Sequence, residues 1–148
     1  MTFHDLPPDW PTRSLADPLF AADLLDLCVS DADRTTGGLS FLLCRGDGSL
    51  AQPVFVGDIP HETALRETVS ATVLSCVTLA GIGGVVIGIA RSWGLVSDQD
   101  RRLHQHALEV CGRALVDLHG TFVVTGAGVT HLPVARGCGP ARTSRERS

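Results

Sequence analysis

The first apolar residues repeat at helical spacing, and a helix-start signal precedes them. Asp17 is a residue type that commonly caps helix N-termini, and Pro18 suits the first helical position. Apolar side chains then recur on one helical face as far as Cys28. The polar run 30–38 interrupts this pattern, so we expect a single helix that ends before it.

The pattern then changes to two strand-like segments and back to helical spacing. Residues 39–45 and 50–57 are strand-like, and Gly46-Asp47-Gly48 between them supplies the small residues of a tight turn. Helical spacing returns over residues 61–80, and Gly81 is placed to end that helix. We therefore expect a hairpin followed by a second helix.

The second half of the chain begins with an unbroken apolar run. Residues 83–90 are apolar throughout, as expected for a strand buried on both faces. Helical spacing over residues 98–118 predicts a third helix, and residues 121–125 and 129–132 predict a closing hairpin. The predicted order is α-β-β-α-β-α-β-β, which favours an α/β fold with a mixed sheet and helices packed against it.

Composition and length indicate one domain with an arm and a tail. The chain has 148 residues, of which 44% are hydrophobic and 19% charged, as in ordinary globular proteins. Residues 1–16 contain three prolines and predict an extended arm, residues 17–132 predict the domain, and residues 133–148 predict a disordered tail. The longest apolar stretch, 77–90, contains four glycines and is too short to span a bilayer. No secretory signal pattern opens the chain, so we expect a cytoplasmic protein without membrane contact.

Charge is distributed unevenly between the domain and the tail. The tail carries four arginines and one glutamate, a net charge of +3, whereas residues 1–132 carry eight arginines and fifteen acidic residues, a net charge of −7. An acidic body argues against broad nucleic-acid binding, which would be confined to the arginine-rich tail if it occurred. The five cysteines form no CxxC pair, and four lie in apolar segments, which suits reduced thiols in a core.

Three segments resemble the JAB/MPN domain, and most closely its bacterial RadC-like branch. The run GGVVIGIARSWG stands where that family has an apolar strand ending in its HNHPSG motif. The run SDQDRRLHQHALEVCGRALVDLHGTFVVTGAGVTHL follows the family's S-x-x-D, long helix and closing hairpin, and SLAQPVFVGDIP resembles its second strand. The resemblance covers roughly residues 39–132 and implies a JAB/MPN-like, cytidine-deaminase-like sheet sandwiched by helices.

Active members of this family are zinc hydrolases, and the resemblance implies that their zinc ligands are missing here. The two histidines of H-x-H fall on Ala90 and Ser92, with Arg91 between them, and the following proline falls on Trp93. Alanine cannot bind zinc, and a neutral serine hydroxyl is a poor ligand. The positive charge of Arg91 would oppose a dication further. We expect no metal and no other cofactor.

Two residues of the family pattern do match, and one further position does not. Ser97 and Asp100 fall on its S-x-x-D, while the general-base glutamate falls near Gln52, which cannot accept a proton. The S-x-x-D run is also a capping box at the start of a long helix, and this interpretation explains both residues without a metal. The degenerate site is thus expected at Gln52, Ala90, Arg91, Ser92, Trp93, Ser97 and Asp100.

Other arrangements of reactive side chains provide weaker signals. His104 and His106 form an H-x-H, but on a helix they point about 200° apart and cannot share one metal. Cys111 lies on an apolar helix stripe, where a thiol is usually inert. Ser92 has no evident base near it in the sequence.

The sequence therefore favours a catalytically inactive JAB/MPN-like domain that works by binding a protein partner or a second copy of itself. One alternative is a hydrolase with a relocated site that uses His119, Asp117 or Ser92. The other is a small-ligand sensor that uses the vacated pocket around Arg91, Trp93 and Gln52.

Overall fold

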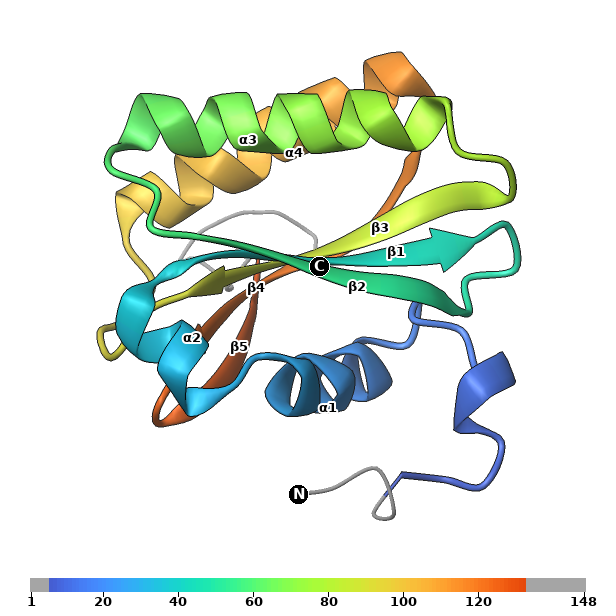
Figure 1. Cartoon of the computed structure of the whole chain (residues 1–148), viewed down its shortest axis with the longest axis horizontal. Coiled ribbons are helices and arrows are strands. Elements are labelled where there is room, and N and C mark those ends of the chain that lie inside the picture. The colour runs from blue at the N-terminus through green and yellow to red at the C-terminus, as the bar shows by residue number, and fades with distance from the viewer. Residues whose placement is uncertain (1–5, 133–148) are drawn as a thin grey trace, which may run out of the picture.

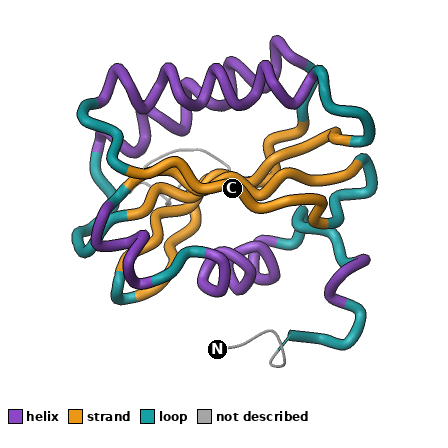
Figure 2. Tube along the Cα trace, viewed as in Figure 1, coloured by secondary structure: helices purple, strands orange, loops and turns teal. Residues whose placement is uncertain are grey.

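The computed structural model describes residues 6–132, which form a five-stranded mixed sheet between helices on both faces. In Figure 1, α3 and α4 lie on one side of the sheet and α1 and α2 on the other, and Figure 2 shows the same layers by element type. In chain order the elements are η2 (Trp10–Thr12), α1 (Pro18–Cys28), α2 (Asp31–Thr36), β1 (Gly38–Arg45), β2 (Leu50–Gly57), α3 (Glu62–Val77), β3 (Ile82–Ala90), α4 (Asp98–Ala114), β4 (Asp117–Thr125) and β5 (Gly128–Leu132).

The strands are ordered β2-β1-β3-β4-β5. β1 pairs antiparallel with both β2 and β3, β3 pairs parallel with β4, and β4 pairs antiparallel with β5. The parallel pair needs a crossover connection, and α4 provides it. β3 is therefore the central strand of the sheet, and the chain leaves its C-terminal end toward α4.

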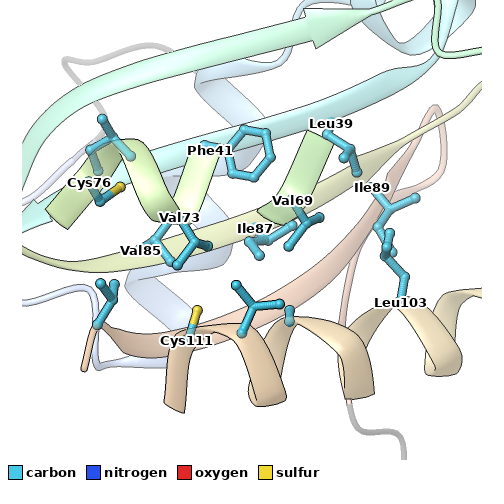
Figure 3. Close-up of a cluster of buried hydrophobic side chains, with 14 of the residues drawn as sticks. Leu39, Phe41, Val69, Val73, Cys76, Val85, Ile87, Ile89, Leu103 and Cys111 are labelled. Atoms are coloured by element: carbon cyan, nitrogen blue, oxygen red, sulfur yellow. The ribbon is translucent and has the colours of Figure 1, made fainter. Parts of the chain in front are cut away.

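Two apolar clusters hold the layers together, one on each face of the sheet. Figure 3 shows the larger cluster, in which residues of β1 and β3, such as Phe41 and Ile87, meet residues of α3 and α4, such as Val73 and Cys111. The smaller cluster joins the other face of β1, β3 and β4 to α1 and includes Val86. Alternate residues of β3 are thus buried on opposite faces, which confirms the prediction of a strand covered on both sides.

The predicted helix starts are confirmed by their hydrogen bonds. The side chain of Asp17 accepts a hydrogen bond from the backbone N–H of Leu19, with Pro18 in the first turn. Ser97 accepts from the backbone N–H of Asp100, and the Asp100 carboxylate accepts from the N–H of Ser97. Each arrangement satisfies backbone donors that the first helical turn leaves free.

The structure corrects the predicted order before β1. The polar run 30–38 contains the helix α2, so two helices and not one precede the first strand. A reciprocal capping box between Ser30 and Asp33 starts α2. This helix has no apolar period, so periodicity alone overlooked it.

The predicted boundary between the third helix and the closing hairpin is also wrong. α4 ends at Ala114 and not at 118, because Leu115 adopts a left-handed conformation with φ 58°. β4 then begins at Asp117, four residues earlier than expected, because Asp117 pairs with Gly84 of β3. Pairing with a buried neighbouring strand outweighs the helical spacing of these residues.

The segment before α1 differs from an extended arm where it is described. It contains the 3-10 helix η2, and Leu6 and Leu15 are buried in the smaller cluster. The predicted tail, residues 133–148, lies outside the described residues. Within residues 6–132, no helix combines the length and the apolar character needed to cross a bilayer.

Candidate functional site

The chain leaves the sheet at the C-terminal end of β3, and most of the predicted site residues lie here. Ala90 ends β3 and is buried, and Arg91 follows it directly. The guanidinium of Arg91 donates two hydrogen bonds to the carboxylate of Asp100 in α4, at 2.8 Å to Oδ1 and 2.6 Å to Oδ2. This bidentate geometry is the strongest form of an arginine–carboxylate pair.

The same two side chains also hold the loop between β3 and α4. Arg91 Nη2 donates to the carbonyl oxygen of Leu95 at 2.7 Å, and the N–H of Ser97 donates to Asp100 Oδ2 at 2.8 Å. The backbone N–H of Arg91 donates to Val124 in β4 at 3.0 Å. The ion pair thus ties the loop to α4 near its end, while β4 holds its start.

The surroundings of Asp100 keep its carboxyl group in the ionised form that the pair with Arg91 requires. Asp100 is buried, and burial alone would raise the pKa of its carboxyl group. Hydrogen bonds from Arg91 and Ser97 outweigh this effect, and together with the positive charge of Arg91 they hold the pKa of Asp100 below its ordinary value. The carboxylate is therefore ionised and already bound to a cation.

The loop residues 92–96, which we call the Trp93 loop, expose two large apolar side chains. Trp93 is 82% exposed and Leu95 is 91% exposed. Between them Gly94 has φ 118°, a conformation that a side chain would strain. Ser92 lies in the hinge of the loop: its hydroxyl donates to the carbonyl of Arg34 at 3.4 Å, and its carbonyl accepts from the N–H of Gly126 at 3.1 Å.

Gln52 does not lie with the other predicted residues. It is exposed near the start of β2 and pairs with Leu43, which in turn pairs with Val85 of β3. Val85 lies five residues before Ala90, so about 17 Å of strand separates Gln52 from this site. The structure therefore brings together Ala90, Arg91, Ser97 and Asp100, with Ser92 and Trp93 in the adjoining loop, and leaves Gln52 apart.

The residues at this site do not fit a catalytic zinc. Asp100 is the one strong ligand type among the predicted positions, and both of its oxygens bind Arg91. A zinc ion would have to displace that guanidinium and would find Ala90 and Ser92 where two ligands are needed. Among residues 6–132, no group of three or more histidine, cysteine, aspartate or glutamate side chains is placed to hold a metal ion.

The helical H-x-H diverges as predicted. A hydrogen bond of 2.8 Å joins His104 Nδ1 to Thr121 Oγ1 in β4, whereas one of 2.9 Å joins His106 Nε2 to Ser70 Oγ in α3. Burial lowers the pKa of His104, which keeps its ring neutral. These two histidines are hydrogen-bonded parts of the packing between α4 and its neighbours.

The candidate nucleophiles and bases are not brought together. Asp117 pairs with Gly84, six residues before the end of β3 at Ala90, so about 20 Å of strand separates Asp117 from the start of the loop that carries Ser92. His119 lies beside Gly84 at the same remote end of β3. Burial raises the pKa of the Cys111 thiol to about 11, so it is not a thiolate at neutral pH.

Two hollows lie near the C-terminal end of β3, and one of them borders the Trp93 loop. The first, which we call the β3-end cavity, has a volume of about 300 Å³ and is lined by Arg91 and Asp100 together with apolar residues such as Leu65 and Leu103. The second, which we call the β5 groove, has a volume of about 460 Å³ and separates residues 94–96 from the β4–β5 hairpin.

A scan against models of known protein families finds no match to this chain, and a search of the curated proteins finds none either.

One residue that supports the site was missed by the sequence analysis. Arg34 of α2 is buried and donates to the carbonyl oxygens of Val29, Asp26 and Thr125 at 3.2, 2.9 and 2.8 Å. It thereby joins α1 and α2 to the end of β4. The sequence pattern that could have predicted its position is the Ser30–Asp33 capping box, which indicates a helix that contains Arg34.

Proposed function

We propose that this chain is a JAB/MPN-like domain with a degenerate site that acts in the cytoplasm as a protein-interaction module. The proposal rests on one observation: the Arg91–Asp100 ion pair occupies the place where the resemblance implies a metal, and it holds a loop that exposes Trp93 and Leu95. A family member that had kept its chemistry would need Asp100 free to bind zinc.

The physical chemistry of the Trp93 loop suits protein binding. Tryptophan is among the residue types that contribute most to binding energy at protein interfaces. Loop ordering on binding costs free energy, and the hydrogen bonds of Arg91 and Asp100 have already removed much of that freedom. The loop therefore presents apolar area at a low cost in entropy.

Photo-crosslinking tests this proposal. With a photoreactive phenylalanine analogue in place of Leu95, irradiated cells should form an adduct of one defined mass, either with another protein or with a second copy of this chain. The adduct should disappear with Trp93→Ala, a change that we expect to alter the free energy of unfolding by less than about 0.5 kcal/mol because Trp93 is exposed.

The matched control carries the analogue at Leu115, which is also 91% exposed. Equal adducts from positions 95 and 115 would count against a specific surface. A purified chain that holds stoichiometric zinc, and loses stability on chelation, would overturn the proposal of a degenerate site.

The β3-end cavity favours small-ligand sensing as a second candidate function. Arg91 lines this cavity, but Trp93 and Gln52 do not, and the charge of Arg91 is already matched by Asp100. A ligand would therefore meet apolar walls and the polar side chains of Gln99 and Thr36, which favours small neutral molecules over anions.

Thermal-shift screening with small amides and alcohols tests the sensor. A ligand at one hundred times its dissociation constant should stabilise the fold by about 2.7 kcal/mol. The shift should be lost in Gln99→Ala and kept in Gln105→Ala, a control at an exposed position of the same helix. Absence of any shift would remove this candidate.

A further inference from the structure

We infer that the β5 groove binds an extended peptide segment of a partner protein, which adds as a strand beside β5 and places an acidic side chain against Arg101. This inference rests on the proposed interaction function and names its partner chemistry. Three independent features of the described residues support it: the shape of the groove, the open edge of β5 and the hydrogen-bonding state of Arg101.

The groove lies on the α4 side of the sheet and has rigid walls. Residues 94–96 form one wall, and the Arg91–Asp100 pair fixes them through the carbonyl of Leu95. The other side is formed by the β4–β5 hairpin, where Val123 pairs with Thr130 and both line the groove. Because paired residues share a face of the sheet, a strand added beside β5 would direct alternate side chains into the groove.

The edge of β5 is open to such an addition. β5 is the last strand of the sheet in the described part of the chain, so alternate residues direct their N–H and C=O groups away from β4. Its sequence, GVTHL, contains none of the prolines, lysines or other charged residues that commonly protect an edge. The opposite edge strand, β2, carries Pro53 in its middle and is protected. Among residues 6–132, the sheet thus carries a strand-breaking proline at its β2 edge and has no strand paired to its β5 edge.

Arg101 provides the positive charge that an acidic side chain of the partner would bind. It lines the groove, and within residues 6–132 its one side-chain hydrogen bond is donated by Nη1 to Asp98 at 3.0 Å. The Asp98 side chain is 86% exposed, and such surface pairs contribute little stability. The Nε–H of Arg101 is buried and has no acceptor among the described residues, so an incoming carboxylate would bind the terminal nitrogens, where Asp98 binds now. A carboxylate from a partner can therefore replace Asp98 at low cost.

Charge also distinguishes this occupant from the chain's own tail. Residues 133–148 carry a net charge of +3 and would bring arginines toward Arg101. Like charges oppose that contact. A β-forming segment with an acidic side chain would instead form backbone hydrogen bonds with β5 and an ion pair with Arg101.

Selection from a random dodecapeptide phage library on the immobilised full chain tests the inference. We expect enriched peptides that combine β-branched residues with aspartate or glutamate. Their dissociation constants, measured by fluorescence anisotropy, should rise about tenfold with Arg101→Gln and with Leu95→Ala. The matched controls Arg113→Gln and Leu115→Ala, on exposed residues outside the groove, should change them less than twofold.

Hydrogen exchange adds a readout of strand addition. Bound peptide should slow amide exchange in β5 and leave β2 unchanged. Peptides that lose binding with Trp93→Ala and Leu95→Ala but keep it with Arg101→Gln would overturn the groove inference and leave the Trp93 loop as the binding surface. Binding that appears only after removal of residues 133–148, or a dimer that Leu95→Ala dissociates, would identify the tail or a second copy as the occupant and would also overturn it.

Discussion

Replacing Asp100 with alanine should lower the free energy of unfolding by about 3 kcal/mol. The carboxylate is buried, binds both terminal nitrogens of Arg91 and completes the capping box with Ser97. Loss of a capping residue costs about 1 kcal/mol, and removing one partner of a buried ion pair costs several more when the other is fully buried. Because Arg91 keeps partial access to water, we expect the loss of the cap and of the ion pair together to cost about 3 kcal/mol, which is low for a buried pair. Urea denaturation at neutral pH measures the difference.

The effect of Asp100 should depend on pH in a defined direction. Its pKa in the folded chain lies below the ordinary value of about 3.9, so the folded state favours the ionised form. The corresponding stability is present above about pH 5 and is lost as the pH falls through the folded-state pKa. The difference between the wild-type chain and Asp100→Asn should therefore shrink in acid.

Asp98 provides the matched control for Asp100. It occupies the same helical turn, but its side chain is exposed and pairs only with Arg101 among the described residues. Asp98→Ala should cost less than about 0.5 kcal/mol. Equal costs for the two variants would mean that the Arg91–Asp100 pair does not hold the loop.

The start of α4 was predictable from the sequence, but the ion pair beside it was not. Ser97 and Asp100 are three residues apart, and a capping box requires only that local spacing. The contact between Arg91 and Asp100 depends on how the intervening loop turns, which includes the positive φ of Gly94. Local patterns therefore identified both residues of the cap and did not reveal the partner that neutralises one of them.

Gln52 illustrates a different limit of prediction from sequence, which concerns the register between strands. The family resemblance orders residues along the chain, but it does not specify which strand positions face each other. In the structure the pairing of β1 with both neighbours sets Gln52 level with Val85, far from the end of β3. Register between strands arises from tertiary pairing, and no short sequence window contains it.

Arg34→Met should lower the free energy of unfolding by about 3 kcal/mol and loosen the Trp93 loop as well. Methionine retains an apolar stem but leaves the carbonyls of Val29 and Thr125 without the donors that they now have in a buried place. The ion pair with Asp26 is lost too. Urea denaturation should show the loss of stability, with Arg113→Met, at an exposed position, as a control that changes little.

The second effect follows from the position of Arg34 next to the site. Its own carbonyl accepts the hydroxyl of Ser92, and Thr125, which it holds, precedes the Gly126 N–H that binds the Ser92 carbonyl. Displacement of α2 should therefore free the hinge of the Trp93 loop, and the amide of Gly126 should exchange faster in Arg34→Met than global unfolding explains. Binding of any partner at Trp93 should weaken in the same variant, because a mobile loop must be ordered on binding. Unchanged exchange at Gly126 in a destabilised variant would show that α2 stabilises the fold without positioning the loop.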